Sequence, residues 1–214
     1  MTRYAKVFLT LVVAAGLTVG LHGMAWAELS AQDKADISRV EDLLNGIQTL
    51  QARFTQLSDN GGTAEGVFYL QRPGRLRFEY DPPTPLLIVG TGKTIVFYDS
   101  RLGQVTYVPI KSTPLGFLVD ETISFSGDTE VVRVDREPGA LAITLADKKG
   151  RRDGTITLIF SDSPLRLRMW RVTDAQGKVT TIALSGMRTN LTLDAELFRF
   201  VNPDPFGQTS GDPQ

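Results

Sequence analysis

The sequence predicts an α+β protein: an unclosed, curled antiparallel β-barrel of about 10–11 strands, with an N-terminal helix and a short helical flap as its lid. Short runs rich in branched and aromatic residues recur between residues 50 and 184, separated by turn residues at the spacing of an antiparallel meander. One amphipathic stretch precedes these runs, and one apolar segment interrupts them. A curled sheet has one face to bury, so the helix and the flap are expected to cover it.

The first 27 residues have the three parts of a secretory signal peptide. Arg3 and Lys6 form a basic start, residues 7–21 are an apolar run, and residues 25–27 read Ala-Trp-Ala, a small-residue cleavage pattern. The run is shorter than the roughly 20 residues that span a bilayer, which disfavours a membrane anchor. We therefore expect this segment to be cleaved during export to the periplasm.

The mature chain is expected to begin with a helix. Residues 30–45 carry apolar side chains at three- and four-residue steps, which is the pattern of an amphipathic helix. Ser30 can cap its start, and Asp33 stands at the reciprocal position, where a negative charge also favours the helix dipole. Gly46 can end the helix.

Residues 66–80 predict two strands folded back on each other at Arg72-Pro73-Gly74. In the second arm Leu76, Phe78 and Tyr80 alternate with charged residues, so one face is apolar and the other is charged. The other strands are expected at 50–57, 86–89, 94–98, 104–108, 130–134, 141–145, 155–160, 165–172 and 179–184.

Residues 113–119 are too apolar for a solvated loop and contain a proline near their start. We expect a short helix or flap that rests on an apolar surface, with Leu115, Phe117 and Leu118 facing that surface. Residues 28–206 then form one domain, and residues 207–214, which are Gly, Ser, Pro and polar residues, form a disordered tail.

The composition excludes several classes of chemistry. The single histidine, His22, lies in the signal peptide, and the chain has no cysteine. A nucleophile paired with His is therefore impossible in the mature protein, and zinc loses its usual ligands. Basic residues fall from 23 to 21 after cleavage, against 24 acidic residues, which gives no basis for binding nucleic acid. We expect no cofactor, no metal and no enzymatic activity.

Two motifs that suggest chemistry have simpler explanations. The carboxylates of Glu79 and Asp81 lie at a strand end and are better explained as solvated charges. Gly92-Lys93-Thr94 copies the end of a phosphate-binding loop, but Leu87 stands where that loop needs its first glycine. The segment also joins two expected strands, which predicts a hairpin.

The apolar face itself has two interpretations. Leu76, Phe78, Tyr80, Ile95 and Phe97 are either the ordinary core of a sandwich or barrel, which periodicity alone favours, or the lining of a ligand cavity. The arginine before Pro73 is likewise either an exposed turn residue or a lid latch, in which its guanidinium donates to backbone carbonyls of the flap.

Several motifs occur in a fixed order over nearly the whole mature chain. They are Phe54-Thr55-Gln56, Gly66-x-Phe68-x-Leu70-x-Arg72-Pro73-x-x-Leu76-x-Phe78, Gly92-Lys93-Thr94-x-x-Phe97-Tyr98, Gln104-Val105-Thr106, Thr113-Pro114-Leu115 and Phe198-Arg199-Phe200-x-x-Pro203. With these motifs the sequence resembles a known family, the periplasmic outer-membrane lipoprotein carriers (LolA).

The resemblance implies an unclosed barrel with a helical lid and a hydrophobic cavity for the acyl chains of lipoproteins. Such a carrier, a monomer, accepts cargo from an inner-membrane ATP-driven lipoprotein-releasing complex and hands it to the outer membrane or to its lipoprotein receptor. The related receptor has a similar fold but needs a lipidated cysteine, which this chain lacks.

Arg72 falls on the motif arginine that bonds to the lid and holds the closed state. Leu76 falls where the family usually has a phenylalanine that helps at the membrane-side handover; leucine keeps the apolar character and loses the ring. Arg75 and Arg77 make this edge more basic than the family pattern suggests. The candidate ligand-binding residues are Arg72 (also the latch), Leu76, Phe78, Tyr80, Ile95, Phe97, Leu115, Phe117 and Leu118.

Three alternatives to a lipoprotein carrier stay open at this point. The same fold could carry another envelope lipid, such as a glycolipid or hopanoid, and nothing in the sequence separates these cargoes. It could be an envelope sensor, which is expected to carry an anchor or a partner domain. An enzyme would be indicated by hydrolysis that a single carboxylate substitution abolishes.

Overall fold

The first element is a capped helix, as the sequence predicts: α1 spans Ala31–Asn45. The Ser30 hydroxyl accepts a hydrogen bond from the N–H of Asp33 at 3.1 Å, and the Asp33 carboxylate accepts one from the N–H of Ser30 at 2.8 Å. These two bonds satisfy N–H groups that a helix start otherwise leaves unpaired. At the other end Gly46 donates its N–H to the Asp42 carbonyl at 3.0 Å.

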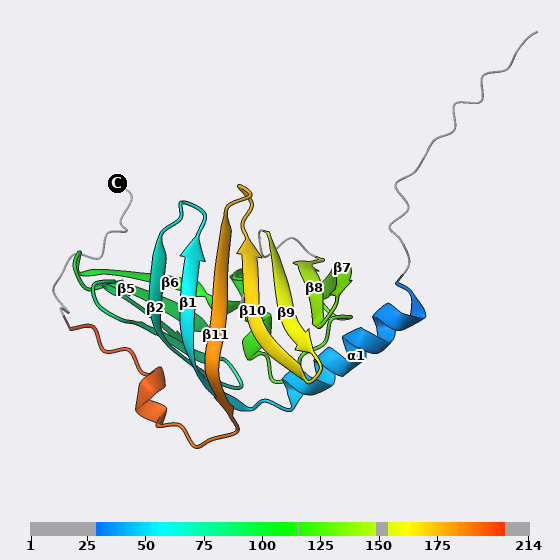
Figure 1. Ribbon diagram of the computed structural model, residues 1–214. Helices are drawn as coiled ribbons and strands as arrows, with labels where there is room; N and C mark the ends of the chain where they lie inside the picture. Colours follow the sequence, from blue (N-terminus) through cyan, green and yellow to red (C-terminus); the bar gives the residue numbers. More distant parts are fainter. Residues whose placement is uncertain (1–28, 115, 149–153, 204–214) are drawn as a thin grey trace, which may run out of the picture.

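The computed structural model describes residues 29–114, 116–148 and 154–203, whose strands form one antiparallel sheet (Figure 1). The strands are β1 Thr49–Ser58, β2 Thr63–Gln71, β3 Arg75–Tyr80, β4 Leu86–Thr91, β5 Thr94–Asp99, β6 Gln104–Pro109, β7 Thr129–Glu137, β8 Ala140–Asp147, β9 Thr155–Asp162, β10 Leu165–Thr173 and β11 Val179–Thr189. The short 3₁₀ turns are η1 Ile110–Ser112, η2 Gly116–Val119 and η3 Ala195–Phe198.

The sheet is eleven-stranded, in the order β6-β5-β4-β3-β2-β1-β11-β10-β9-β8-β7. β6 and β7 are its two edges, and they do not pair with each other, so the curled barrel is unclosed. The predicted fold class is confirmed. The Gly92-Lys93-Thr94 segment joins β4 to β5 as a hairpin, as expected.

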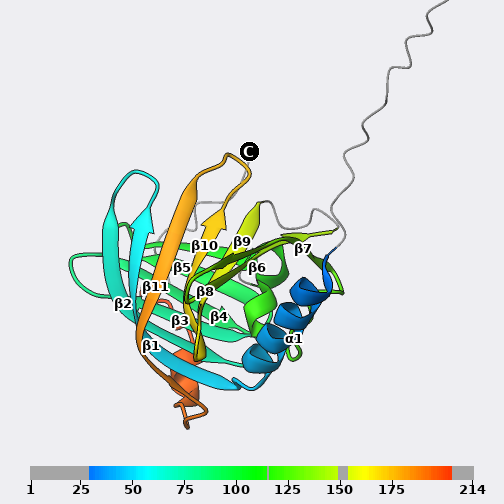
Figure 2. The same ribbon diagram turned by 45° about the vertical axis from the view of Figure 1, so that its right-hand side comes forward.

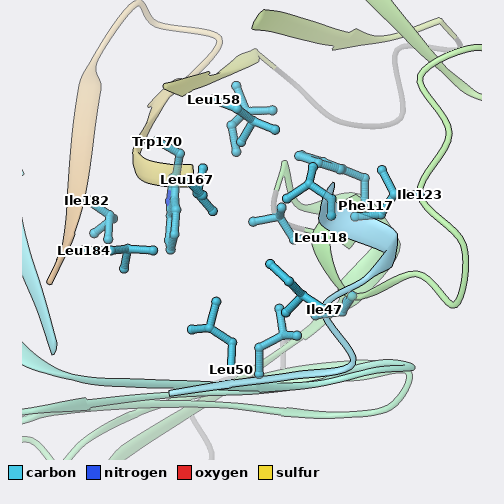
Figure 3. Packing of buried hydrophobic residues seen from close by; sticks show 14 of the residues in the cluster. Ile47, Leu50, Phe117, Leu118, Ile123, Leu158, Leu167, Trp170, Ile182 and Leu184 are labelled. Atoms are coloured by element: carbon cyan, nitrogen blue, oxygen red, sulfur yellow. The ribbon is translucent and has the colours of Figure 1, made fainter. Parts of the chain in front are cut away.

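The aromatic hairpin of β2 and β3 forms the centre of the sheet's inner face. Phe68 pairs with Phe78 across the two strands, and their ring centroids are 4.4 Å apart. Gly66 lies beside them because only glycine fits there: a Cβ would sit 2.1 Å from the Glu79 carbonyl oxygen. Trp170, from β10, meets the ring of Phe68 edge-on at 5.5 Å. Figure 3 shows Trp170 beside Ile182 and Leu184 of β11 in this apolar interior.

The segment predicted as a flap follows η1 and contains η2, and all four residues of η2 are buried. Gly116 is required at its start, because a Cβ there would sit 2.4 Å from the Ile110 carbonyl oxygen. In Figure 2 these turns lie beside α1. Helix and flap therefore form one lid over the inner face of the sheet.

The outer face of β3 and β4 is covered by the last part of the described chain. η3 packs on these strands, and the Leu197 carbonyl accepts a hydrogen bond from Arg77 Nη1 at 3.2 Å. Phe200 stacks on Tyr98 of β5 with centroids 5.6 Å apart. None of the helices in the described ranges is long and apolar enough to cross a membrane. The predicted signal peptide (1–27), the predicted tail (207–214) and Leu115 lie outside the described residues.

Candidate ligand cavity and its lid

An apolar cavity of about 300 Å³ lies between the inner face of the sheet and the flap. Strands from both halves of the sheet and the flap contribute to its wall. The lining residues are Gln56 of β1, Leu76, Phe78 and Tyr80 of β3, Ile88 of β4, Ile95 and Phe97 of β5, Thr113 and Pro114 of the flap, Trp170 and Val172 of β10, and Thr180 and Ile182 of β11.

The polar groups of this cavity carry no charge. The Tyr80 hydroxyl donates a hydrogen bond to Gln56 Oε1 at 2.7 Å, and burial raises the pKa of Tyr80 to about 12, so the phenol stays neutral. The Trp170 indole N–H, in a side chain that is 1 % exposed, has no acceptor among the described residues. A lining of this kind accommodates a hydrocarbon chain without requiring a counter-ion.

Arg72 lies outside the cavity and makes hydrogen bonds to both parts of the lid. Its Nε donates to the Leu118 carbonyl of η2 at 2.9 Å, and its Nη1 donates to the carbonyls of Leu44 and Ile47, the latter at 2.9 Å. One guanidinium therefore connects the flap with the C-terminal end of α1. Arg72 is 8 % exposed, and this burial lowers its pKa to about 10, with Asp120 opposing the shift.

Main-chain and side-chain contacts reinforce the same junction. The N–H of Gly74 donates to the Val119 carbonyl at 2.7 Å. The Asn45 side chain binds both main-chain groups of Ile123, accepting from its N–H at 2.7 Å and donating to its carbonyl at 2.9 Å. Hydrogen bonds therefore connect α1, the flap and the β2–β3 turn at one junction.

A different set of contacts fixes the N-terminal end of α1. Asp36, which is 7 % exposed, accepts hydrogen bonds from Arg39 Nη1 and from Arg136 Nε of β7, both at 2.7 Å. Arg136 Nη2 also lies 2.7 Å from Asp33 Oδ1. Arg39 continues this chain of ion pairs to Asp162 at the end of β9.

The structure brings five of the predicted site residues around one cavity: Leu76, Phe78, Tyr80, Ile95 and Phe97. Phe117 and Leu118 are buried lid residues that do not line it, with Phe117 packing edge-on against Phe125. The wall contributed by Trp170, Val172, Thr180 and Ile182 was not predicted, although alternation in 165–172 is a signal for it. In the described ranges, no group of three or more His, Cys, Asp or Glu side chains could hold a metal ion.

Comparison with known proteins gives a consistent result. Residues 45–201 match the family model described as "Outer membrane lipoprotein carrier protein LolA". Proteins named "Outer-membrane lipoprotein carrier protein" from Methylococcus capsulatus and Chromobacterium violaceum are 32% and 33% identical to this chain. The alignments cover 84% of this chain and 90% of the first relative, and 97% and 100% for the second. A relative of the same name from Azotobacter vinelandii is 33% identical, covering 86% of this chain and 93% of its own length.

Proposed function

This chain belongs to the outer membrane lipoprotein carrier protein LolA family, and we propose that it is a periplasmic carrier that holds the acyl chains of lipoproteins in the cavity beneath its lid. It receives cargo from an inner-membrane ATP-driven releasing complex and delivers it to the outer membrane or to a receptor there. The proposed role is non-catalytic, because binding and release of cargo require no covalent step.

One observation carries this proposal: an uncharged apolar cavity is closed by a lid that a single buried arginine holds through main-chain carbonyls. Burial of each methylene group contributes about 0.8 kcal/mol, so an acyl chain binds strongly to such a cavity. A carrier must also release its cargo. Hydrogen bonds from a charged donor, worth about 1.5–3 kcal/mol each, favour the closed and empty state and so oppose retention.

The test is release of an acylated lipoprotein from inner-membrane vesicles into a soluble complex with the mature protein, followed by mass analysis of the complex. Wild-type protein is expected to carry the acylated lipoprotein. Leu76→Glu places a carboxylate in the cavity wall, where Leu76 is 2 % exposed, and is expected to abolish cargo uptake.

The matched control is Leu57→Glu, because Leu57 is 50 % exposed and follows the cavity residue Gln56 on β1, so it points to the other face. This variant is expected to carry cargo like the wild type. Circular dichroism establishes that both variants fold. Undiminished uptake by folded Leu76→Glu protein would refute the proposed cavity, and a complex that contains only free lipid would identify a shuttle for another envelope lipid.

A further inference from the structure

Strands β10 and β11 separate at one end of the sheet. Within the described residues they pair from Met169 opposite Ala183 to Thr173 opposite Val179 and no further. Residues 165–167 of β10 pair with β9, and the last residues of β11 pair with β1. Figure 1 shows the gold and orange strands diverging toward the end where the chain enters β1 from α1. The sheet therefore contains a fork, bounded by residues 165–168 and 184–189.

Irregular pairing on both strands explains the fork. Arg168 is an extra residue in β10, because the register against β9 shifts between Leu167 and Met169. The register between β1 and β11 shifts near Gly186, whose φ of +57° lies in the left-handed region that favours glycine. A bulge bends its strand and increases the local twist, so the two strands turn away from each other.

The fork encloses a groove of about 590 Å³. Leu43 of α1 and Ile47, just after that helix, contribute apolar surface to it. Arg166 and Arg168 line the β10 side, and Met187 lines the β11 side. Both arginines are exposed, and within the described part of the chain neither guanidinium has a hydrogen bond or ion pair. The groove thus presents two uncompensated positive charges next to apolar side chains.

The geometry points to an extended acidic polypeptide as the occupant, and we propose that the fork binds the peptide segment of the cargo next to its acylated end. Strand edges without a sheet partner are templates for an added strand, because their N–H and C=O groups are free to pair. Two guanidiniums favour carboxylates, and the apolar surface favours alternate hydrophobic side chains. A phospholipid headgroup would use the guanidiniums and leave the strand edges unused.

The fork lies next to the acyl cavity along β10 and β11. The inference therefore rests on the proposed function, which places the acyl chain in that cavity. On β10, Leu167 lines the groove and Trp170 lines the cavity. On β11, Leu184 lines the groove and Ile182 lines the cavity (Figure 3). A single molecule can therefore place its acyl chain in the cavity and its peptide in the fork. Ile47 also lines the groove while its carbonyl accepts the hydrogen bond from Arg72, so the peptide lies next to the latch.

The test uses the full mature chain and two labelled peptides of about ten residues, one alternating Glu with Val and one alternating Gln with Val, each prepared with and without an N-terminal acyl group. The acidic peptide is expected to bind, as measured by fluorescence anisotropy, at least about tenfold more tightly than the Gln peptide. Arg166→Gln with Arg168→Gln is expected to remove this difference. Hydrogen exchange is expected to slow at residues 165–168 and 184–189.

Arg171→Gln is the matched control, because Arg171 is an exposed arginine of β10 that does not line the groove, and it is expected to leave binding unchanged. Equal binding by both peptides, no binding of the unacylated acidic peptide, or protection confined to the β6 or β7 edge would overturn the fork inference. Acylated peptides that bind regardless of sequence would leave the carrier function intact while overturning the fork. An acidic peptide that protects the fork, with no gain from acylation, would support the fork and contradict the acyl carrier.

Discussion

The two ends of α1 are attached to the sheet by different chemistry. At the N-terminal end, carboxylates of Asp33 and Asp36 meet Arg136 on β7, and part of this network is open to solvent. At the C-terminal end, the buried Arg72 donates to main-chain carbonyls, which have no charge to titrate. Ion pairs near solvent weaken in acid and at high salt, whereas the Arg72 guanidinium, with a pKa of about 10, keeps its charge and its carbonyl acceptors in acid. We therefore expect the C-terminal attachment, rather than the N-terminal one, to control the lid.

The largest expected effect comes from Arg72→Leu, which removes every guanidinium bond at the C-terminal end. Buried carbonyls of Ile47 and Leu118 then lose their donors, and the closed state loses about 3–4 kcal/mol. Hydrogen exchange at residues 116–125 is expected to speed up, while exchange in the first turn of α1 stays unchanged. Opening the lid then costs less free energy. The affinity for an acylated peptide should therefore rise by at least about tenfold.

Arg72→Lys serves as the control for charge alone, since one ammonium cannot reproduce the several hydrogen bonds of the planar guanidinium. Its exchange rates are expected to lie between those of the wild type and Arg72→Leu. If Arg72→Leu leaves the exchange of residues 116–125 unaltered, the latch does not hold the lid.

A smaller effect is expected from Asp36→Asn at the N-terminal end. The substitution removes the charge that pairs with Arg39 and Arg136, and the free energy of unfolding should fall by about 1–2 kcal/mol. Faster exchange should be confined to the first turns of α1, with affinity for the acylated peptide unchanged. Urea denaturation and hydrogen exchange measure the two quantities, and a change in affinity would show that both ends control the lid.

The smallest expected effect is a response to acid. Hydrogen bonds from Ser30, and then Arg136, hold the pKa of Asp33 below its usual 3.8. A carboxyl whose pKa is lower in the folded protein stabilises the fold above pH 3.8, and this contribution is lost as the pH falls through the folded value. Arg72, with a pKa of about 10, stays protonated throughout this range.

In NMR spectra recorded from pH 6 down to about pH 3, the amides of the first turn of α1 should therefore change as the pH falls below 3.8, because this change follows the protonation of Asp33. Asp33→Asn should remove the response of the first turn. A first-turn response that persists in Asp33→Asn protein would show that it does not come from this carboxyl.

Local sequence patterns predicted the parts of this molecule that depend on neighbouring residues. Alternation of Leu76, Phe78 and Tyr80 predicted one wall of the cavity, and Ser30 with Asp33 predicted the helix start. The opposite wall, from Trp170 and Ile182, depends on sheet curl that brings β10 and β11 over β3, and curl follows from strand order rather than from any one segment. The burial of Asp36 depends likewise on Arg136, one hundred residues away along the chain.

The unclosed barrel has a mechanical consequence. In a closed barrel, strand number and shear set the circumference, so the interior has one size. Here β6 and β7 do not pair, so this constraint on the circumference is absent. We therefore expect the volume of about 300 Å³ to increase when the sheet opens between these two edges to admit a larger ligand.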